Sequence, residues 1–344
     1  MKRLRVVLAV LVAVFVFAAG SGIWLAIAFL HATVQVSEIG TEFEILPGES
    51  FGKISRELAA RGIIDRPQLL RVYARVTGKA NAVQAGDYRI MPGTTPVDLL
   101  EQFTRGDVQL YSLTIIEGWS HRDLLKALRD HPMIAATMTD ADWPALLAEL
   151  GASTMHPEGL FLPETYRFPK NTNDRTILKQ AYTLLQQTLE AEWRERAQDL
   201  PISDPYEALI LASIIEKETA RPDERERIAG VFVRRLENRM RLQTDPTVIY
   251  GIGPAFDGNL TRQDLETDTP YNTYTRNGLP PTPIALPGRA AIHAALHPAD
   301  GNELYFVATG LGDGSHRFSS SKAEHDAAVA EYLSRLRQRR LQGN

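Results

Sequence analysis

The stretch that decides the fold is residues 206–219, YEALILASIIEKET. Between positions 209 and 215 the only polar side chain is that of Ser213, and Glu216 and Glu218 follow directly. A helix that is apolar on nearly all sides is buried within its domain rather than lying on its surface. The stretch therefore predicts a helical core that carries two carboxyl groups at one end.

Two carboxyl groups beside buried surface suggest acid–base chemistry. Glu216 and Glu218 fall on different apolar stripes of the predicted helix. Loss of hydration raises the pKa of a carboxyl group, and a raised pKa lets it hold a proton near neutral pH and act as a general acid. The alternative is that these acids pair with Lys217, Arg221 or Arg225, although acids at a helix C-terminus oppose the helix dipole. Spacing does not choose between the two glutamates.

Composition excludes several classes of site. The chain has 344 residues, 38 Lys+Arg, 42 Asp+Glu, a net charge of −4 and no cysteine. This excludes disulfides, a thiol nucleophile and cysteine-ligated metals, and the mild acidity gives no sign of a nucleic-acid partner. HExxH, GxSxG, GxxxxGK[ST] and GxGxxG patterns are absent, and His293 and His297 are four apart without the acid of the zinc-protease pattern. We expect no metal and no cofactor.

The N-terminus predicts a membrane anchor. Residues 6–30 carry no charge, and Lys2, Arg3 and Arg5 precede them. As a helix this run would be roughly 37 Å long, which is enough to cross a bilayer. A cleaved signal peptide is the alternative, but the apolar run resumes after residues 18–21 (AAGS), which could imitate a cleavage site. We expect a cytoplasmic tip at 1–5, a single transmembrane helix at 6–30 and a body outside the cytoplasmic membrane.

Short strand–turn–helix units follow the anchor. Helices are predicted at 51–60, 96–103 and 121–128, with Ser50, Thr95 and Ser120 as N-caps. The first unit, with its PGES turn at 47–50, resembles a LysM module, a βααβ unit that binds glycans containing N-acetylglucosamine. We place a LysM-like subdomain at 38–110. It either binds glycan or only braces the domain behind it.

The remainder is predicted to be mostly helical. Helices are expected at 143–150, 176–200, 224–240 and 321–341, a strand at 304–308, and His316 in a turn. Residues 243–298 show little helical or strand period, and an ordered loop of that length is usually functional. Its hydroxyl, amide and aromatic groups suit sugar binding, although they could simply build turns. Together with two residues of the buried helix, the predicted substrate-binding set is Ser213, Glu218, Gln243, Thr244, Asp245, Thr247, Tyr250, Asn272 and Tyr274.

Several runs, in one order, match a known family. They are 158–159 (EG) with 163–166 (PETY), 211–219 (LASIIEKET), 242–251 (LQTDPTVIYG), 271–274 (YNTY), 278–281 (GLPP), and 297–299 (HPA) before 304–307 (LYFV). The chain resembles the MltG/YceG-like endolytic murein transglycosylases, although Thr282 stands where that family's pattern has glycine and residues 160–162 (LFL) vary its usual segment.

The resemblance implies an α+β fold, with a lysozyme-like, mostly helical catalytic domain at 111–341 behind the LysM-like subdomain. It implies cleavage between N-acetylmuramic acid and N-acetylglucosamine within nascent peptidoglycan strands, leaving 1,6-anhydro ends and terminating glycan elongation. It also implies that the first acid of the Glu-Lys-Glu motif, Glu216, is catalytic. The implied partners are glycan strands, the cytoplasmic membrane and peptidoglycan synthases.

Two other functions remain open from the sequence. A membrane-tethered, non-catalytic glycan-binding or division scaffold would not need Glu216 in a cleft. A hydrolytic muramidase would need a second carboxylate, for which Asp245, Glu266 and Asp268 are the candidates in the following loop region.

Overall fold

The computed structural model describes residues 2–341, apart from the side chains of Lys2, Arg3 and Arg340. The predicted cytoplasmic tip begins at Met1, which lies outside the described residues. The chain forms two compact units: unit 1 comprises residues 1–111 with 167–171, and unit 2 comprises 112–166 with 172–344.

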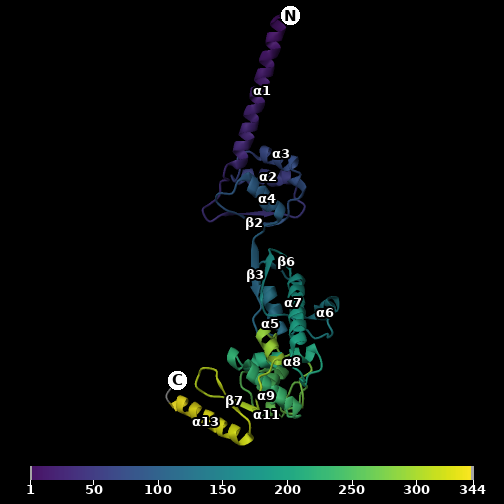
Figure 1. Cartoon of the computed structure of the whole chain (residues 1–344), viewed down its shortest axis with the longest axis vertical. Coiled ribbons are helices and arrows are strands. Elements are labelled where there is room, and N and C mark those ends of the chain that lie inside the picture. The colour runs from purple at the N-terminus through teal and green to yellow at the C-terminus, as the bar shows by residue number, and fades with distance from the viewer. Residues whose placement is uncertain (1, 342–344) are drawn as a thin grey trace. The chain divides into compact units, whose positions relative to one another are not determined.

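The fold is α+β and helix-rich (Figure 1). The helices are α1 (Lys2–His31), α2 (Phe51–Ala60), α3 (Pro67–Val76), α4 (Pro96–Arg105), α5 (His121–Asp130), α6 (Trp143–Leu150), α7 (Asp174–Glu195), α8 (Pro205–Glu218), α9 (Arg225–Glu237), α10 (Asp245–Ile252), α11 (Arg262–Glu266), α12 (Arg289–Leu296) and α13 (Lys322–Leu341). The strands are β1 (Thr41–Ile45), β2 (Gly86–Ile90), β3 (Leu110–Thr114), β4 (Ile134–Ala135), β5 (Thr165–Pro169), β6 (Thr172–Asn173), β7 (Tyr305–Ala308) and β8 (His316–Ser319). They pair as β1–β2, β3–β5, β4–β6 and β7–β8.

The N-terminal helix α1 contains the predicted membrane span. Its segment from Leu4 to His31 has a mean hydropathy of 2.7 and, by length and composition, can cross a membrane. Most of its large apolar side chains are exposed, whereas Phe29, near its end, is buried in the core of unit 1. An exposed apolar helix of this length is what single-pass anchoring requires.

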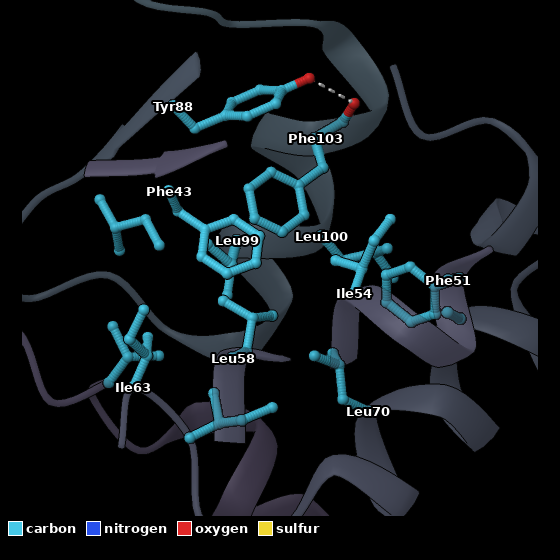
Figure 2. Packing of buried hydrophobic residues seen from close by; sticks show 14 of the residues in the cluster. Phe43, Phe51, Ile54, Leu58, Ile63, Leu70, Tyr88, Leu99, Leu100 and Phe103 are labelled. Carbon is cyan, nitrogen blue, oxygen red and sulfur yellow. Dashed lines mark hydrogen bonds between the residues drawn. The ribbon is translucent and has the colours of Figure 1, made fainter. Parts of the chain in front are cut away.

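Unit 1 packs helices against one antiparallel strand pair. The order is β1–α2–α3–β2, and Phe43 of β1 lies opposite Tyr88 of β2. The Phe103 ring of α4 contacts both aromatic rings (Figure 2), and the Tyr88 hydroxyl donates to the Gln84 carbonyl at 2.7 Å and lies 3.3 Å from that of Phe103. This bond lets a phenol sit in an apolar core without an unpaired polar group.

The predicted helix starts in the N-terminal half are confirmed. Ser50, Thr95 and Ser120 each accept a hydrogen bond from the backbone N–H three residues on, and the last two form full capping boxes. These local contacts satisfy the free N–H groups of a first turn, which is why sequence alone located them. Helix α3 was not predicted, because only Leu70 and Ala74 of its ten residues are buried.

Unit 2 is built around α8. All of residues 208–215 are buried, as the opening stretch predicts. Helix α12 packs most extensively against α8, and α7 and α9 also contact both helices. Strands β7 and β8 form an antiparallel pair, and α13 lies beside β7 (Figure 1).

Three predictions about unit 2 were wrong. The segment 243–298 is not irregular throughout, since it contains α10, α11 and α12; α12 is alanine-rich, which weakened its apolar signal. Helix α7 ends at Glu195 rather than at residue 200, because the backbone becomes extended at Arg196 and the Ala197 N–H donates to the Leu296 carbonyl at 2.9 Å. His316 lies in β8 rather than in a turn, and its ring lies 2.7 Å from the buried Glu224 carboxylate.

Candidate active site

Glu216 lies in the last turn of α8, and only 6% of its side chain is exposed. Its Oε2 accepts a hydrogen bond from the Gly288 N–H at 2.9 Å. Its Oε1 lies 3.7 Å from Nη2 of Arg225, the first residue of α9. One carboxylate is thus held by the N-cap of α12 and by a cation from the next helix.

A second carboxylate, that of Glu117, shares this cation. Its Oε2 lies 3.8 Å from the same Arg225 Nη2, and 48% of its side chain is exposed. Backbone bonds place it there: Gly118 N–H donates to the Leu286 carbonyl at 2.9 Å, and Leu286 N–H donates to the Trp119 carbonyl at 2.7 Å. We call Glu117, Glu216 and Arg225 the acid cluster.

Two glycines make this approach possible. Gly118 has φ of +77°, which L side chains rarely adopt. A Cβ on Gly288 would lie 1.9 Å from Glu117 Oε1, so any other residue there would displace the Glu117 carboxyl group. The acid cluster therefore depends on backbone positions as well as on its charged side chains.

The pKa of Glu216 is raised above the ordinary value of a glutamate. Burial is the main cause that raises its pKa, and the charge of Glu117 raises it further. The Gly288 N–H, Arg225 and Lys217 act in the opposite direction, but the net shift is upward. A half-enclosed carboxyl group with a raised pKa can donate a proton to a leaving-group oxygen.

Glu218 faces a different part of unit 2. Two positions along a helix correspond to about 200° of rotation, so Glu216 and Glu218 point to nearly opposite sides. Glu218 accepts a hydrogen bond from the Thr244 hydroxyl, and burial raises its pKa to about 7. It lines a cavity of about 370 Å³, the α8–α13 cavity. Five residues of the predicted substrate-binding set line that cavity: Glu218, Gln243, Thr244, Asp245 and Tyr274.

The rim of the α8–α13 cavity is polar and backbone-strained. Gln243 is exposed and has φ of +51°, a conformation uncommon for a residue other than glycine. The Tyr274 hydroxyl donates to Asp245 Oδ1 at 2.6 Å. Backbone strain of this kind concentrates at ligand sites.

Tyr250 lies elsewhere, in a second cavity of about 540 Å³. Its hydroxyl donates at 3.1 Å to Glu158, a fully buried carboxylate that also lies 2.6 Å from His121 Nδ1. Glu216 lines neither of these cavities. Glu216, the five residues of the α8–α13 cavity and Tyr250 therefore lie in three separate places.

Three residues of the predicted substrate-binding set are buried and form hydrogen bonds within unit 2. Ser213 is fully buried, accepts from the Ile284 N–H at 3.0 Å and donates to the Ile210 carbonyl at 2.7 Å. Thr247, also fully buried, donates to the Thr244 carbonyl at 2.8 Å. Asn272 is 1% exposed, and its amide group donates to three backbone carbonyls between residues 264 and 267. Ser213 and Thr247 thus serve as internal supports, whereas Asn272 also lines a further cavity, of about 280 Å³.

The acids weighed for hydrolysis lie apart from the acid cluster. Asp268 forms an ion pair with Arg276, which together with the Thr275 hydroxyl lowers the Asp268 pKa to about 2. Glu266 pairs with Arg262 at 2.7 Å on an exposed helix. The acid that does approach Glu216 is Glu117, which sequence reasoning missed. In the sequence Glu117 is an acid between a short strand and a glycine turn, and this pattern is too common to identify a functional residue.

The YceG-like family model matches residues 43–331. The endolytic murein transglycosylase of Bacillus subtilis (strain 168) is 30% identical over 329 residues, which cover 89% of each chain. That of Streptococcus pneumoniae (strain D39) is 25% identical over 319 residues, covering 83% of this chain and 57% of that protein. A crystal structure of a yceG-like protein from Listeria monocytogenes has a TM-score of 0.54 and 29% identity, covering 85% of this chain and 99% of that one.

Proposed function

Since the chain belongs to the YceG-like family, we propose that it is an endolytic murein transglycosylase whose general acid is Glu216. The assignment of Glu216 as the acid rests on the surroundings of its carboxyl group. It is nearly buried, hydrogen-bonded on one oxygen to the Gly288 N–H, and raised in pKa. Curated relatives similar along most of this chain carry the name endolytic murein transglycosylase.

The proposed reaction needs one carboxyl group in two roles. Glu216 protonates the glycosidic oxygen between N-acetylmuramic acid and N-acetylglucosamine, and the bond from that oxygen to muramic C1 breaks. The muramic C6 hydroxyl then attacks C1, and its proton goes to the Glu216 carboxylate. The new O6–C1 bond closes a 1,6-anhydro ring and restores the acid. An internal nucleophile acts at a high effective concentration, so no water has to be positioned.

In this account Glu117 acts on Glu216 rather than on the sugar. Burial raises the Glu216 pKa and the negative charge of Glu117 raises it further, while the shared Arg225 guanidinium limits the repulsion between the two acids. Arg225 Nε is buried and has no hydrogen-bond partner among residues 2–341. A buried donor of this kind is costly unless a ligand oxygen satisfies it, which supports binding of a polar substrate here.

The α8–α13 cavity supplies a second contact region for a long strand. Exposed Gln243 and Asp245 and half-buried Tyr274 offer amide, carboxylate and hydroxyl groups. We assign them to a sugar unit distant from the cleaved bond. An endolytic enzyme binds several sugars on both sides of its cleavage point, so a separate subsite is compatible with Glu216 as the acid.

The anchor and the N-terminal unit complete the proposal. Helix α1 holds the enzyme in the cytoplasmic membrane as a single span, and the basic residues at its start keep the N-terminus in the cytoplasm. We assign residues 38–110 to a LysM-like subdomain, which would bind the N-acetylglucosamine units of the glycan, and residues 111–341 to the catalytic domain. Peptidoglycan synthases are the proposed neighbours, because they supply these strands.

Digestion of purified peptidoglycan tests the proposal. The full chain in detergent is incubated with sacculi, and the ends of the released fragments are identified by mass. Fragments with 1,6-anhydro ends are expected. Reducing ends would make Glu117 the base of a hydrolytic muramidase, and binding without any fragments would indicate the non-catalytic scaffold.

A further inference from the structure

A cluster of two imidazoles and one carboxylate lies outside the acid cluster and both cavities. His293 lies in α12, and His297, one turn later, is the C-cap of that helix. Glu192 belongs to α7. Their candidate ligand atoms, one from each side chain, all lie within 4.8 Å of one another. We propose that Glu192, His293 and His297 form a binding site for a divalent cation of the zinc class.

The distances fit a shared ion. Glu192 Oε2 lies 2.8 Å from His293 Nδ1 and 3.6 Å from His297 Nε2. Ligand atoms around a tetrahedral Zn²⁺ at about 2.0–2.2 Å are separated by about 3.4 Å. The two imidazole rings are stacked with centroids 4.3 Å apart, so both rings approach the Glu192 carboxylate together. Small rotations of the three side chains would bring their ligand atoms to the spacing that one bound ion requires.

Contacts on either side hold α7 against α12. Arg289 donates to the Thr188 hydroxyl at 2.7 Å, one turn before the cluster on both helices. The Ala197 N–H, from just beyond the end of α7, donates to the carbonyl of Leu296, the residue before His297, at 2.9 Å. The backbone positions of Glu192 and the two histidines are therefore set by other contacts, which lowers the ordering cost of binding an ion.

The donor set selects the class of cation. Imidazole nitrogen suits Zn²⁺ and its neighbours, whereas Mg²⁺ and Ca²⁺ prefer sites made of oxygen. Two histidines and one glutamate leave a fourth position, which water can fill. The His293 side chain is 48% exposed, so the ion would enter directly from solvent.

The sequence alone could not complete this site. The four-residue spacing of the histidines was visible, but no acid follows them in a known metal-binding pattern, and Glu192 is more than ninety positions earlier. The fold supplies it, because α7 and α12 pack against each other. The site would join these two helices, and α12 begins next to Gly288, the donor to Glu216.

Zinc binding by the full chain tests this inference. Chelator-treated protein without a histidine tag is titrated with Zn²⁺ by calorimetry, and Co²⁺ is added separately to record its visible spectrum. We expect one saturable site, a spectrum of nitrogen–oxygen ligation and a higher unfolding temperature with Zn²⁺. Loss of a partner of a metal ligand already weakens binding about 10–100-fold, so Glu192→Gln, His293→Ala and His297→Ala should each weaken it at least tenfold.

The matched control is His31→Ala, which removes an exposed histidine outside the cluster and should bind Zn²⁺ as the wild type does. Unfolding in chelator shows that each variant is folded. The inference is overturned if the wild type binds no Zn²⁺ saturably, or if the three cluster variants bind as tightly as His31→Ala. Neither result would bear on peptidoglycan cleavage, which is measured separately.

Discussion

Removing the buried hydroxyl group of Ser213 tests whether this residue has a structural role or binds substrate. Ser213→Ala leaves the Ile284 N–H without its acceptor in a buried position. An unpaired buried donor costs about 1–3 kcal/mol. For a unit of this size each kcal/mol lowers the unfolding temperature by about 2–4 °C. A loss of about 2 kcal/mol therefore predicts a decrease of about 4–8 °C for unit 2.

Scanning calorimetry of the full chain in detergent measures this decrease, and hydrogen exchange locates it at the segment around Ile284. Ser55→Ala is the matched control. Ser55 is also fully buried in a helix and donates to a backbone carbonyl three residues earlier, that of Gly52. No N–H from another described segment donates to it, so its loss should cost much less. An unchanged unfolding temperature for Ser213→Ala, together with a raised KM, would refute the structural role.

Three further changes test other parts of the account. Glu117→Gln removes the like charge that raises the Glu216 pKa, so the loss of activity with rising pH should begin at a lower pH, as a pH–rate profile would show; an unshifted profile would mean that Glu117 does not act on Glu216. The pKa of Glu218 is raised to about 7, so its contribution to stability is present below about pH 4.5 and is lost as pH rises through 7. Glu218→Gln should flatten that dependence in thermal melts, and an equally steep curve would contradict the assignment. Deletion of residues 1–31 should release the protein from membranes on fractionation, and a truncated chain that still sediments with them would argue against α1 as the anchor.

The parts predicted from sequence are those set by local interactions. The apolar run before Glu216 gave a buried α8, and the caps at Thr95 and Ser120 located two helix starts. Each depends on residues within two turns of one another. The end of α7 was predicted wrongly because it depends on a distant contact. The Ala197 N–H donates to the Leu296 carbonyl, which lies far along the chain.

The candidate site was harder to predict because its parts are far apart in the chain. Glu117 reaches Arg225 and Glu216 only through the backbone bonds between the turn at Gly118 and the segment before α12. The sequence showed that Thr247 and Asn272 could form hydrogen bonds, but not that other protein groups already use them. Hydrogen-bonding capacity can be seen in a sequence, whereas access to solvent comes from packing.

The most direct test compares the two glutamates at the end of α8. Purified peptidoglycan is digested with the wild type, Glu216→Gln and Glu218→Gln, each confirmed to be folded, and the fragment ends are identified by mass. Glutamine keeps an acceptor for the Gly288 N–H or the Thr244 hydroxyl, so either variant loses mainly its acid chemistry. The account predicts 1,6-anhydro fragments from the wild type, none above background from Glu216→Gln, and continued release from Glu218→Gln. An active Glu216→Gln enzyme, or one inactivated only by Glu218→Gln, would contradict it.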